Sequence, residues 1–391
     1  MASRIQVAEE FQELRAVIKV IGLGGAGGNA INRMVESGMR DVELISANTD
    51  SQVLRHNKAP LRIQLGENLT KGLGVGGDPG KGRLAAMESR DQLREALTGA
   101  DLIFITAGMG GGTGTGAAPV AAEIAREMSA LTIGVVSRPF EFEGKIRAFQ
   151  AENGIKEMRR HVDTLLIIPN DSIFDVIEDN TPSSEAFRKA DDVLRQAIQS
   201  ISDVITTPGL INVDLNDIKA VMANAGEAHM GIGEASGAQR ALQAAKQAIH
   251  SPLLENVSIE GAKGMIVNIV GDRKLTLAEI QQAVDFIKQR ASPEANIKFG
   301  QAFEESLGGK IRITVIATGF PAKRSRLGGR EGFHPVPLST SGRPNPQASA
   351  LFDPEAPAPA HGPQAEAAVD DWSKPAFMHW KVKKLHRGGE E

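Results

Sequence analysis

The chain has 391 residues, a formal net charge of −4 and no cysteine. Without cysteine it has no disulfide framework, zinc–thiolate site, iron–sulfur cluster or thiol nucleophile. It also lacks the strongly basic balance typical of nucleic-acid binders, so we expect no nucleic-acid partner. The N-terminus is charged and no run of 18 apolar residues occurs, which predicts a cytoplasmic protein with no secretory signal and no integral membrane span.

Strand and helix patterns alternate through the first part of the chain. An apolar strand at 17–21 runs into a glycine-rich stretch that opens a helix, and a second helix is expected over 117–128. Further apolar strands are expected at 42–47, 101–106, 131–136 and 164–168. This alternation predicts parallel strands joined by right-handed crossovers, with helices on both faces of the sheet.

A long helix follows this sheet. Apolar residues recur at helical spacing over 183–206, and Pro208-Gly209 ends the pattern. Beyond residue 231 a helix is expected over 276–290. Three β-like segments are expected around it, at 262–270, 298–303 and 310–317. The fold class is therefore α/β, with a Rossmann-like parallel sheet, a long central helix and a second, smaller α/β domain packed against that helix.

The composition changes near Phe320, since 10 of the 19 prolines lie between Pro321 and Glu391. A segment of this composition cannot bury enough apolar surface to offset the entropy of ordering. We predict a disordered linker at 321–369, followed by an aromatic and basic end at 370–391 that carries both tryptophans.

The first of three glycine-rich loops, at 22–29, lies between a predicted strand and a predicted helix. Its Gly22, Gly24 and Gly27 satisfy the pattern GxGxxG, which places backbone N–H groups and the positive end of a helix dipole around an anion. The same pattern fits a dinucleotide-binding enzyme, and also a tight strand–helix turn that needs small residues without any ligand.

The third loop, at 108–116, has six glycines and two threonines in nine residues. A packed turn needs one or two glycines, so six indicate backbone pressed against a ligand, with Thr113 and Thr115 adding hydroxyl contacts. The second loop, at 72–80, follows no clear strand and is equally well explained as a flexible surface loop. No GxxxxGK[ST] motif is present and no lysine lies in the third loop, so backbone dipoles and a metal ion would carry the phosphate charge.

Two acidic positions have competing interpretations. Asp214 and Asp217 could polarise a water molecule for attack on a phosphoryl group, but Asp214 is also a suitable N-cap for the helix that follows. Asp191, on the predicted long helix, could accept hydrogen bonds from a ligand. A lone aspartate on a helix is, however, more often a solvated charge.

Motifs from several parts of the chain resemble the tubulin/FtsZ family. The stretch GMGGGTGTG at 108–116 is similar to the signature of that family. Shorter stretches resemble its other loops, namely GGAGGN at 24–29, ANTD at 47–50, FEFEGKIR at 140–147, PND at 169–171 and NVDLND at 212–217. The resemblance runs from about residue 17 to 320 and implies a GTPase that polymerises into filaments.

The resemblance also implies roles for individual residues. GTP or GDP is the implied ligand, together with Mg2+, and no metal-ligating residue is predicted. The implied nucleotide-binding residues are Gly24, Gly25, Ala26, Gly27, Gly28, Asn29, Gly76, Gly77, Gly110, Gly111, Gly112, Thr113, Gly114, Thr115, Glu143, Arg147, Asn170, Phe187 and Asp191. The implied catalytic residues are Asp214, Asp217 and Asn212. Within this set, Thr113 is expected at the terminal phosphate, Glu143 and Arg147 near the ribose and phosphates, and Asp191 at the base. A carboxylate there could accept hydrogen bonds from both N1–H and the 2-amino group of guanine, a donor pair that adenine lacks.

In this family the catalytic loop enters the nucleotide site of the next subunit. The resemblance therefore implies head-to-tail filaments, hydrolysis activated by self-assembly, and a place in the bacterial division ring at mid-cell. The end at 370–391 partly fits a peptide that docks membrane-tethering and division-regulating proteins, although Lys374 stands where an aliphatic residue is expected. A solubilising disordered end is the alternative.

The resemblance and the composition together divide the chain into seven predicted segments. They are an N-terminal extension (1–16), a GTP-binding domain (17–182), the central helix (183–206), the catalytic loop with its following helix (207–230), a C-terminal α/β domain (231–320), the linker (321–369) and the docking peptide (370–391).

Two other hypotheses compete with this one. A Rossmann dehydrogenase that binds NAD at the first loop needs an acidic residue at the end of the second strand, where Ser46-Ala47-Asn48 stand, and leaves the third loop unexplained. A relative that polymerises without hydrolysis is disfavoured because both Asp214 and Asp217 are present.

Overall fold

The computed structural model describes residues 16–175, 177–178, 180–206, 213–254 and 259–320. The predictions for the linker, the docking peptide, nearly all of the N-terminal extension, and Asn212 lie outside the described residues.

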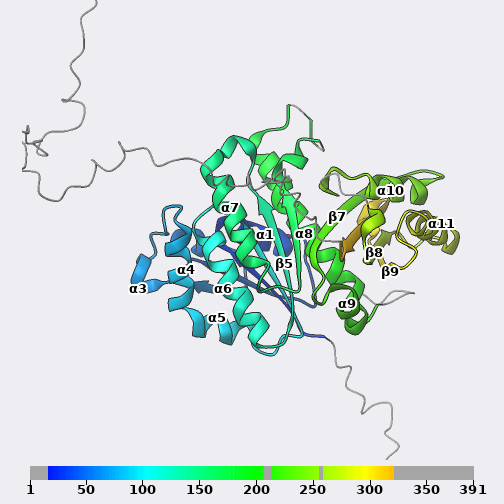
Figure 1. Cartoon of the computed structure of the whole chain (residues 1–391). Coiled ribbons are helices and arrows are strands. Elements are labelled where there is room, and N and C mark those ends of the chain that lie inside the picture. Colours follow the sequence, from blue (N-terminus) through cyan, green and yellow to red (C-terminus); the bar gives the residue numbers. More distant parts are fainter. Residues whose placement is uncertain (1–15, 176, 179, 207–212, 255–258, 321–391) are drawn as a thin grey trace, which may run out of the picture. The chain divides into compact units, whose positions relative to one another are not determined.

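One sheet of ten strands runs through the described part of the chain (Figure 1). The strands are β1 (Ile18–Leu23), β2 (Glu43–Asn48), β3 (Leu61–Gln64), β4 (Leu102–Gly108), β5 (Leu131–Arg138), β6 (Thr164–Pro169), β7 (Gly226–Ala235), β8 (Gly264–Gly271), β9 (Asn296–Phe303) and β10 (Ile311–Thr318). Their order in the sheet is β3-β2-β1-β4-β5-β6-β7-β10-β8-β9. The pairings from β3 to β7 are parallel, whereas β10 pairs antiparallel with both β7 and β8.

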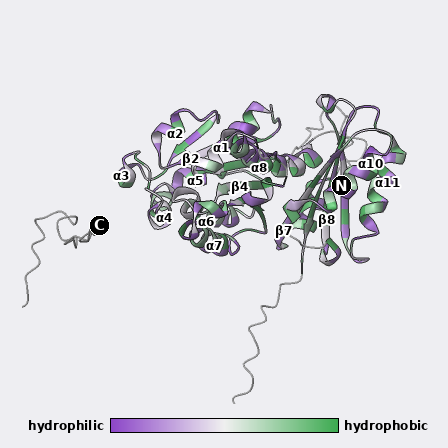
Figure 2. Cartoon of the chain, turned by 90° about the horizontal axis from the view of Figure 1, so that it is seen from above, coloured by the Kyte–Doolittle hydropathy of each residue, from purple (hydrophilic) through white to green (hydrophobic). Residues whose placement is uncertain are grey.

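Helices cover this sheet. They are α1 (Gly24–Glu36), α2 (Ser51–Arg55), α3 (Glu67–Thr70), α4 (Pro79–Glu88), α5 (Arg90–Leu97), α6 (Thr113–Glu127), α7 (Lys145–Met158), α8 (Ser183–Thr206), α9 (Leu215–Met222), α10 (Arg240–Ile249) and α11 (Leu277–Lys288). In Figure 2 hydrophilic and hydrophobic segments alternate along these helices, as expected when one side of a helix packs on a sheet and the other meets water.

The parallel strands are buried on both faces. Val20 of β1 and Phe104 of β4 pack with α1 and α8 on one face. Their neighbours Ile21 and Ile105 point to the other face and pack with α4 to α7. Because successive side chains of a strand point to opposite faces, strands covered on both sides must be apolar throughout, which is the pattern seen in the sequence.

Strand β7 connects the two parts of the sheet. Its first residues pair parallel with β6, and the remainder pairs antiparallel with β10. One face of β8 and β10 packs with α10 and α11, while α8 lies against β8 and β9. The predicted fold class is confirmed for the described residues, and the long helix over 183–206 has its predicted bounds. The domain boundaries stay predictions.

The helix expected over 117–128 begins earlier, at Thr113, because the second half of the third glycine loop is helical. A Cβ on Gly116 would lie 2.2 Å from the carbonyl oxygen of Pro79, so this glycine allows α4 to pack closely on α6. Part of the glycine content of the loop therefore serves helix packing.

Candidate functional site

The first and third glycine loops lie side by side at the carboxyl edge of the sheet. They follow β1 and β4, which are adjacent parallel strands. A Cβ on Gly24 would lie 2.8 Å from the backbone nitrogen of Gly114, so the two loops approach more closely than any larger residue allows. This edge, outside the carboxyl ends of parallel strands, is where open α/β sheets bind ligands.

The second glycine loop lies against the third. A Cβ on Gly112 would lie 2.9 Å from the backbone nitrogen of Asp78, and Gln150 of α7 donates a hydrogen bond of 3.4 Å to the carbonyl oxygen of Gly77. The segment that is ambiguous in the sequence is thus part of the same group of loops. Asp78 also caps α4, because its side chain accepts from the backbone of Gly80 and Lys81.

The glycines of these loops fall into two groups. A Cβ added to Gly25, Gly76, Gly77 or Gly111 would meet no heavy atom within 4 Å, so these residues border open space. At Gly27 the same atom would lie 2.5 Å from the carbonyl oxygen of Thr106, which assigns that residue to strand–helix packing. The first group forms a cradle lined by backbone, as needed for close approach to a phosphate chain.

Other glycines predicted to bind the nucleotide also face protein atoms. A Cβ on Gly28 would lie 3.1 Å from the side chain of Asn57, one on Gly110 would lie 2.9 Å from the carbonyl oxygen of Arg147, and one on Gly114 would lie 2.7 Å from that of Gly108. The side chain of Ala26 packs at the Cα of Gly108. Their role in nucleotide binding stays a prediction.

Two threonines fix the third loop. The hydroxyl oxygens of Thr113 and Thr49 lie 2.7 Å apart, which ties this loop to the loop after β2. Thr115 is buried, and its hydroxyl accepts a hydrogen bond of 2.9 Å from the backbone N–H of Gly110. The hydroxyls of Thr113 and Thr115 therefore contact other protein atoms, and their predicted contacts to a ligand stay predictions. Thr49 belongs to the ANTD motif but was not among the predicted site residues.

The remaining predicted residues lie on α7, α8 and the loops before them. Glu143 and Arg147 form an ion pair, and Glu143 also accepts a hydrogen bond of 3.0 Å from the backbone of Phe140. Phe187 is half-exposed and meets the ring of Phe140 edge-on, with centroids 5.4 Å apart. The side-chain oxygen of Asn170 is buried and has no hydrogen-bond partner among the described residues. A buried acceptor of this kind is available to a donor from outside the protein, such as a water molecule or a ligand.

Asp191 and Asn29 meet where α8 crosses α1. Burial raises the pKa of Asp191 to about 7, although the charge of Arg33 and a hydrogen bond from the side chain of Asn29 both act to lower it. Asp192 next to it raises the pKa further. A partly buried carboxyl group that titrates near neutral pH is poised for a ligand that supplies hydrogen-bond donors.

The predicted catalytic carboxylates lie at the opposite edge of the sheet. Asp214 caps α9 by accepting a hydrogen bond of 2.7 Å from the backbone N–H of Asp217. The last residue of α9, Met222, accepts from the hydroxyl of Thr164, the first residue of β6, at 2.5 Å. The glycine loops follow the carboxyl ends of β1 and β4, whereas α9 lies at the amino end of β6. The structure thus separates Asp214 and Asp217 from the glycine loops of the same chain, and the N-cap role weighed for Asp214 is confirmed.

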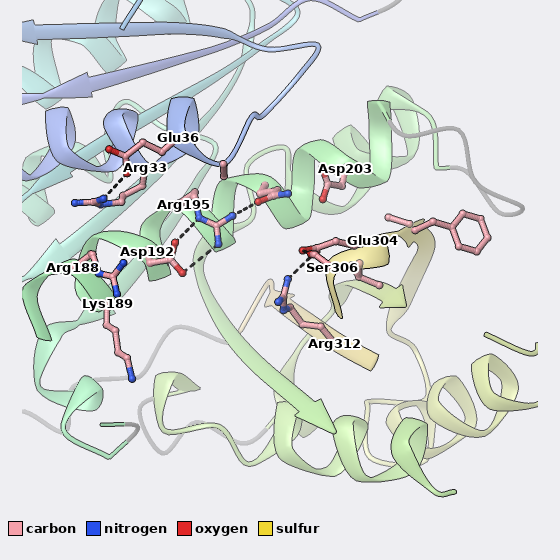
Figure 3. A pocket seen from close by; sticks show the side chains of 15 residues that line it. Arg33, Glu36, Arg188, Lys189, Asp192, Arg195, Asp203, Glu304, Ser306 and Arg312 are labelled. Atoms are coloured by element: carbon pink, nitrogen blue, oxygen red, sulfur yellow. Dashed lines mark hydrogen bonds and ion pairs between the residues drawn. The ribbon is translucent and has the colours of Figure 1, made fainter. Parts of the chain in front are cut away.

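A charged cavity of about 710 Å³ lies between α1, α8 and the strands that follow α9 (Figure 3). Arg195 pairs with Asp192 at 2.5 Å, and Arg312 pairs with Glu304 at 3.2 Å. Arg33 lines the cavity and lies one helical turn beyond Asn29. The cavity therefore adjoins the Asn29–Asp191 end of the loop cluster and is distinct from the glycine cradle.

Comparisons with known proteins agree with this geometry. Residues 17–178 match the Tubulin/FtsZ family, GTPase domain, and residues 226–321 match the FtsZ family, C-terminal domain. An empty FtsZ dimer from M. jannaschii is 43% identical, with a TM-score of 0.77 over 80% of this chain and 90% of that chain.

The chain belongs to the tubulin/FtsZ family. As a member of this family it is a GTPase and binds GTP and GDP. CetZ1 from Haloferax volcanii, solved as a GDP-bound monomer, is 22% identical with a TM-score of 0.69, over 78% of this chain and 95% of that chain. At that identity the likeness shows the shared fold alone.

The described residues of this tubulin/FtsZ member contain no group of three or more histidine, aspartate or glutamate side chains that could hold a metal ion. Mg2+ needs few protein ligands when phosphate oxygens and water complete its octahedron. The backbone-lined cradle is compatible with an ion that enters with the nucleotide. Within the same residues, no helix is long and apolar enough to cross a membrane.

Proposed function

We propose that this GTPase hydrolyses GTP at a site shared by two subunits stacked head to tail. The observation that carries the proposal is the separation of Asp214 and Asp217, at the amino edge of the sheet, from the glycine loops at its carboxyl edge. A single subunit cannot bring these carboxylates to its own nucleotide, whereas the same edge of a neighbouring copy can. An interface between unlike edges does not close on itself and gives filaments.

The nucleotide site divides into a phosphate part and a base part. The cradle formed by Gly25, Gly76, Gly77 and Gly111 supports binding of the phosphates by backbone N–H groups and the N-terminal ends of α1 and α6. Mg2+ would neutralise phosphate charge there. Asp191 would accept from N1–H and the 2-amino group of guanine, beside Asn29 and the unsatisfied oxygen of Asn170.

Chemistry begins when the neighbour's α9 reaches the terminal phosphate. Asp214 and Asp217 would orient and polarise a water molecule for in-line attack on the terminal phosphorus. A carboxylate would accept the proton of the water, and the bond from phosphorus to the bridging oxygen would break to release GDP and phosphate. Asn212, from the same loop, is assigned to the catalytic group on the resemblance of its motif alone.

An exposed apolar stripe supports self-association at the carboxyl edge. Phe142, Ile146 and Phe149 are 67%, 76% and 69% exposed and recur at i, i+4 and i+7 along α7 and the turn before it. Contiguous exposed apolar side chains of this size mark protein–protein contact sites. The similar FtsZ from M. jannaschii was solved as a dimer, and CetZ2 from Haloferax volcanii as a GTPγS-bound protofilament.

In the cell we propose that the filament forms the division ring of a bacterium, in the cytoplasm at mid-cell. The match to the FtsZ C-terminal domain supports this assignment over other branches of the family. Residues 370–391 would dock membrane-tethering and division-regulating proteins through Trp372 and Trp380. Deleting 370–391 should leave GTP turnover intact and abolish ring placement; normal rings would contradict the docking role.

The test of site sharing is turnover against protein concentration. We expect negligible hydrolysis below a threshold and a steep rise above it. A sharper version mixes wild-type protein held below its threshold with an excess of Asp214→Ser subunits, which bind GTP but lack the carboxylate. Neither preparation alone should hydrolyse GTP, but the mixed filaments should. Turnover proportional to wild-type concentration, with no gain on mixing, would refute the shared site.

A further inference from the structure

A lysine from another part of the sheet holds one of the two predicted catalytic carboxylates. The ammonium nitrogen of Lys298 on β9 lies 2.6 Å from a carboxylate oxygen of Asp217 in the first turn of α9. The two side chains are 30% and 38% exposed, so the pair is partly shielded yet open on one side. Lys298 was not among the residues predicted from the sequence.

The position of Lys298 is unusual for a lysine. It pairs in register with Ile266, which lies in the core beneath α8 and α9. Two residues further along β9, a Cβ on Gly300 would lie 2.9 Å from the side chain of Val204 on α8, which places Gly300 and Lys298 on that same inward face. The aliphatic stem thus follows an apolar surface, and only the charged end emerges, at Asp217.

The two carboxylates of this loop are restrained in different ways. Asp214 is fixed by the backbone, because it caps α9. Asp217 is oriented by its ion pair with Lys298. Without that ion pair, Asp217 would be free to change rotamer, and the loop would approach a triphosphate with two uncompensated negative charges.

We propose that Lys298 is a positioning residue for GTP hydrolysis. It orients the Asp217 carboxylate that one subunit presents to the nucleotide of the next, and it offsets one of the two negative charges that would otherwise repel the phosphates. This inference rests on the proposed shared site. It adds a residue from the C-terminal part of the sheet, a part that the proposed mechanism otherwise leaves out of the chemistry.

A purely structural role makes different predictions. If the pair only fastens α9 to β9, its loss should lower stability or the amount of polymer, and hydrolysis should fall only in proportion to polymer. If Lys298 positions Asp217, the polymer should form normally and hydrolysis per assembled subunit should fall.

The experiment uses the full chain well above its assembly threshold, with GTP turnover divided by the amount of sedimented protein. Lys298→Met should lower turnover per assembled subunit about tenfold or more, as small misplacements of reacting groups do. Lys298→Arg should restore most of it, and Lys298→Gln, which keeps a polar hydrogen-bond donor on a shorter side chain without the charge, should remain low. The matched control is Lys310→Met, which removes a lysine paired at 3.0 Å with Glu234 on the same part of the sheet, and it should leave turnover unchanged.

A double-mutant cycle separates positioning from structure. Asp217→Asn combined with Lys298→Met should be no slower than Asp217→Asn alone, because Lys298 acts through Asp217. GTP affinity measured below the threshold should be unchanged in every Lys298 variant, since Lys298 lies far from its own glycine loops. Unaltered turnover in Lys298→Met, or losses that multiply in the double variant, would overturn the proposal. A wild type without a concentration threshold would instead refute the shared site itself.

Discussion

Asp214 accepts a hydrogen bond from the backbone N–H of Asp217 at 2.7 Å, so the carboxylate to which we assign a catalytic role is also the N-cap of α9. The two roles can be separated, because serine is also a good N-cap. We expect Asp214→Ser to keep α9 and GTP binding while lowering turnover about 100-fold or more.

Asp214→Ala should lose turnover to the same extent and, in addition, about 1 kcal/mol of stability with the lost cap. Thr276→Ala is the matched control, because Thr276 caps α11 in the same manner and should affect stability alone. GTP turnover and the free energy of unfolding by denaturant are measured on the same preparation of each variant. Loss of GTP binding in Asp214→Ser would show that the loop has been misassigned.

Asp191 should make GTP binding dependent on pH. Its pKa is raised to about 7 in the free protein, chiefly by burial, whereas guanine's two donors require the ionised form. Apparent affinity scales with the fraction that is competent to bind, so it should fall about tenfold from pH 8 to pH 6.

The binding is measured by equilibrium titration below the assembly threshold. Asp191→Asn removes the titrating group, and its binding should be weaker at pH 8 and nearly flat across the same range. Since the nucleotide's own phosphates also titrate, the difference between the two proteins is the informative quantity. If GTP affinity varied with pH equally in wild type and Asp191→Asn, the assignment of Asp191 to the base site would be wrong.

Substitution by alanine should have opposite effects at Gly25 and Gly27, on GTP binding at the first and on stability at the second. Gly25 borders open space, so Gly25→Ala should leave stability within about 0.5 kcal/mol of wild type and weaken GTP binding. At Gly27 a Cβ would lie 2.5 Å from a carbonyl oxygen, so Gly27→Ala should destabilise the fold by about 1–3 kcal/mol. Thermal unfolding and nucleotide titration distinguish them. A destabilised Gly25→Ala protein with normal affinity would contradict the cradle.

Asp203 on α8 should limit stability at neutral pH. Burial raises its pKa to about 6 in the folded protein, and the charge of Glu304 adds to this against Gln199, Arg195 and Arg312. The folded state therefore favours the protonated form. Its stabilising contribution is greatest below about pH 4 and is lost as pH rises through about 6.

Asp203→Asn should consequently raise the free energy of unfolding by about 1–2 kcal/mol at pH 8, and by much less at pH 4.5. Urea unfolding at the two pH values gives the comparison. Asp285→Asn, at an exposed position of α11, serves as the control for replacing an aspartate on a helix. A gain that is equal at both pH values would assign the effect to packing.

Hydrophobic periodicity in the sequence predicted the helices and strands in which that periodicity is continuous. The helix over 183–206 has its predicted bounds, because its apolar spacing is continuous and Pro208-Gly209 follows it. Strand β3 has only four residues, two of them exposed, and β7 is interrupted by glycines at 231 and 233. Neither has a hydrophobic period strong enough to identify it.

Prediction of the candidate site from the sequence was also limited to what neighbouring residues determine. Glycine spacing brought attention to all three loops, but it could not separate Gly25, at open space, from Gly27, against a carbonyl oxygen. The contacts between Thr49 and Thr113, and between Lys298 and Asp217, join residues 64 and 81 positions apart (298 − 217 = 81). Such contacts form only when the sheet assembles, so no pattern of neighbouring residues in the sequence could have predicted them.

The opposite placement of α9 and the glycine loops gives any head-to-tail row two unlike tips. At one tip the last copy has its cradle uncovered, and no incoming carboxylate can shorten the life of its triphosphate. At the other tip the last copy would have its α9 bare, while its own cradle would be covered by the carboxylates of its neighbour. In the proposed filament, GTP would therefore persist at the tip with the open cradle and be hydrolysed at the covered ones, and this difference between the tips would follow from the edge of the sheet on which α9 lies.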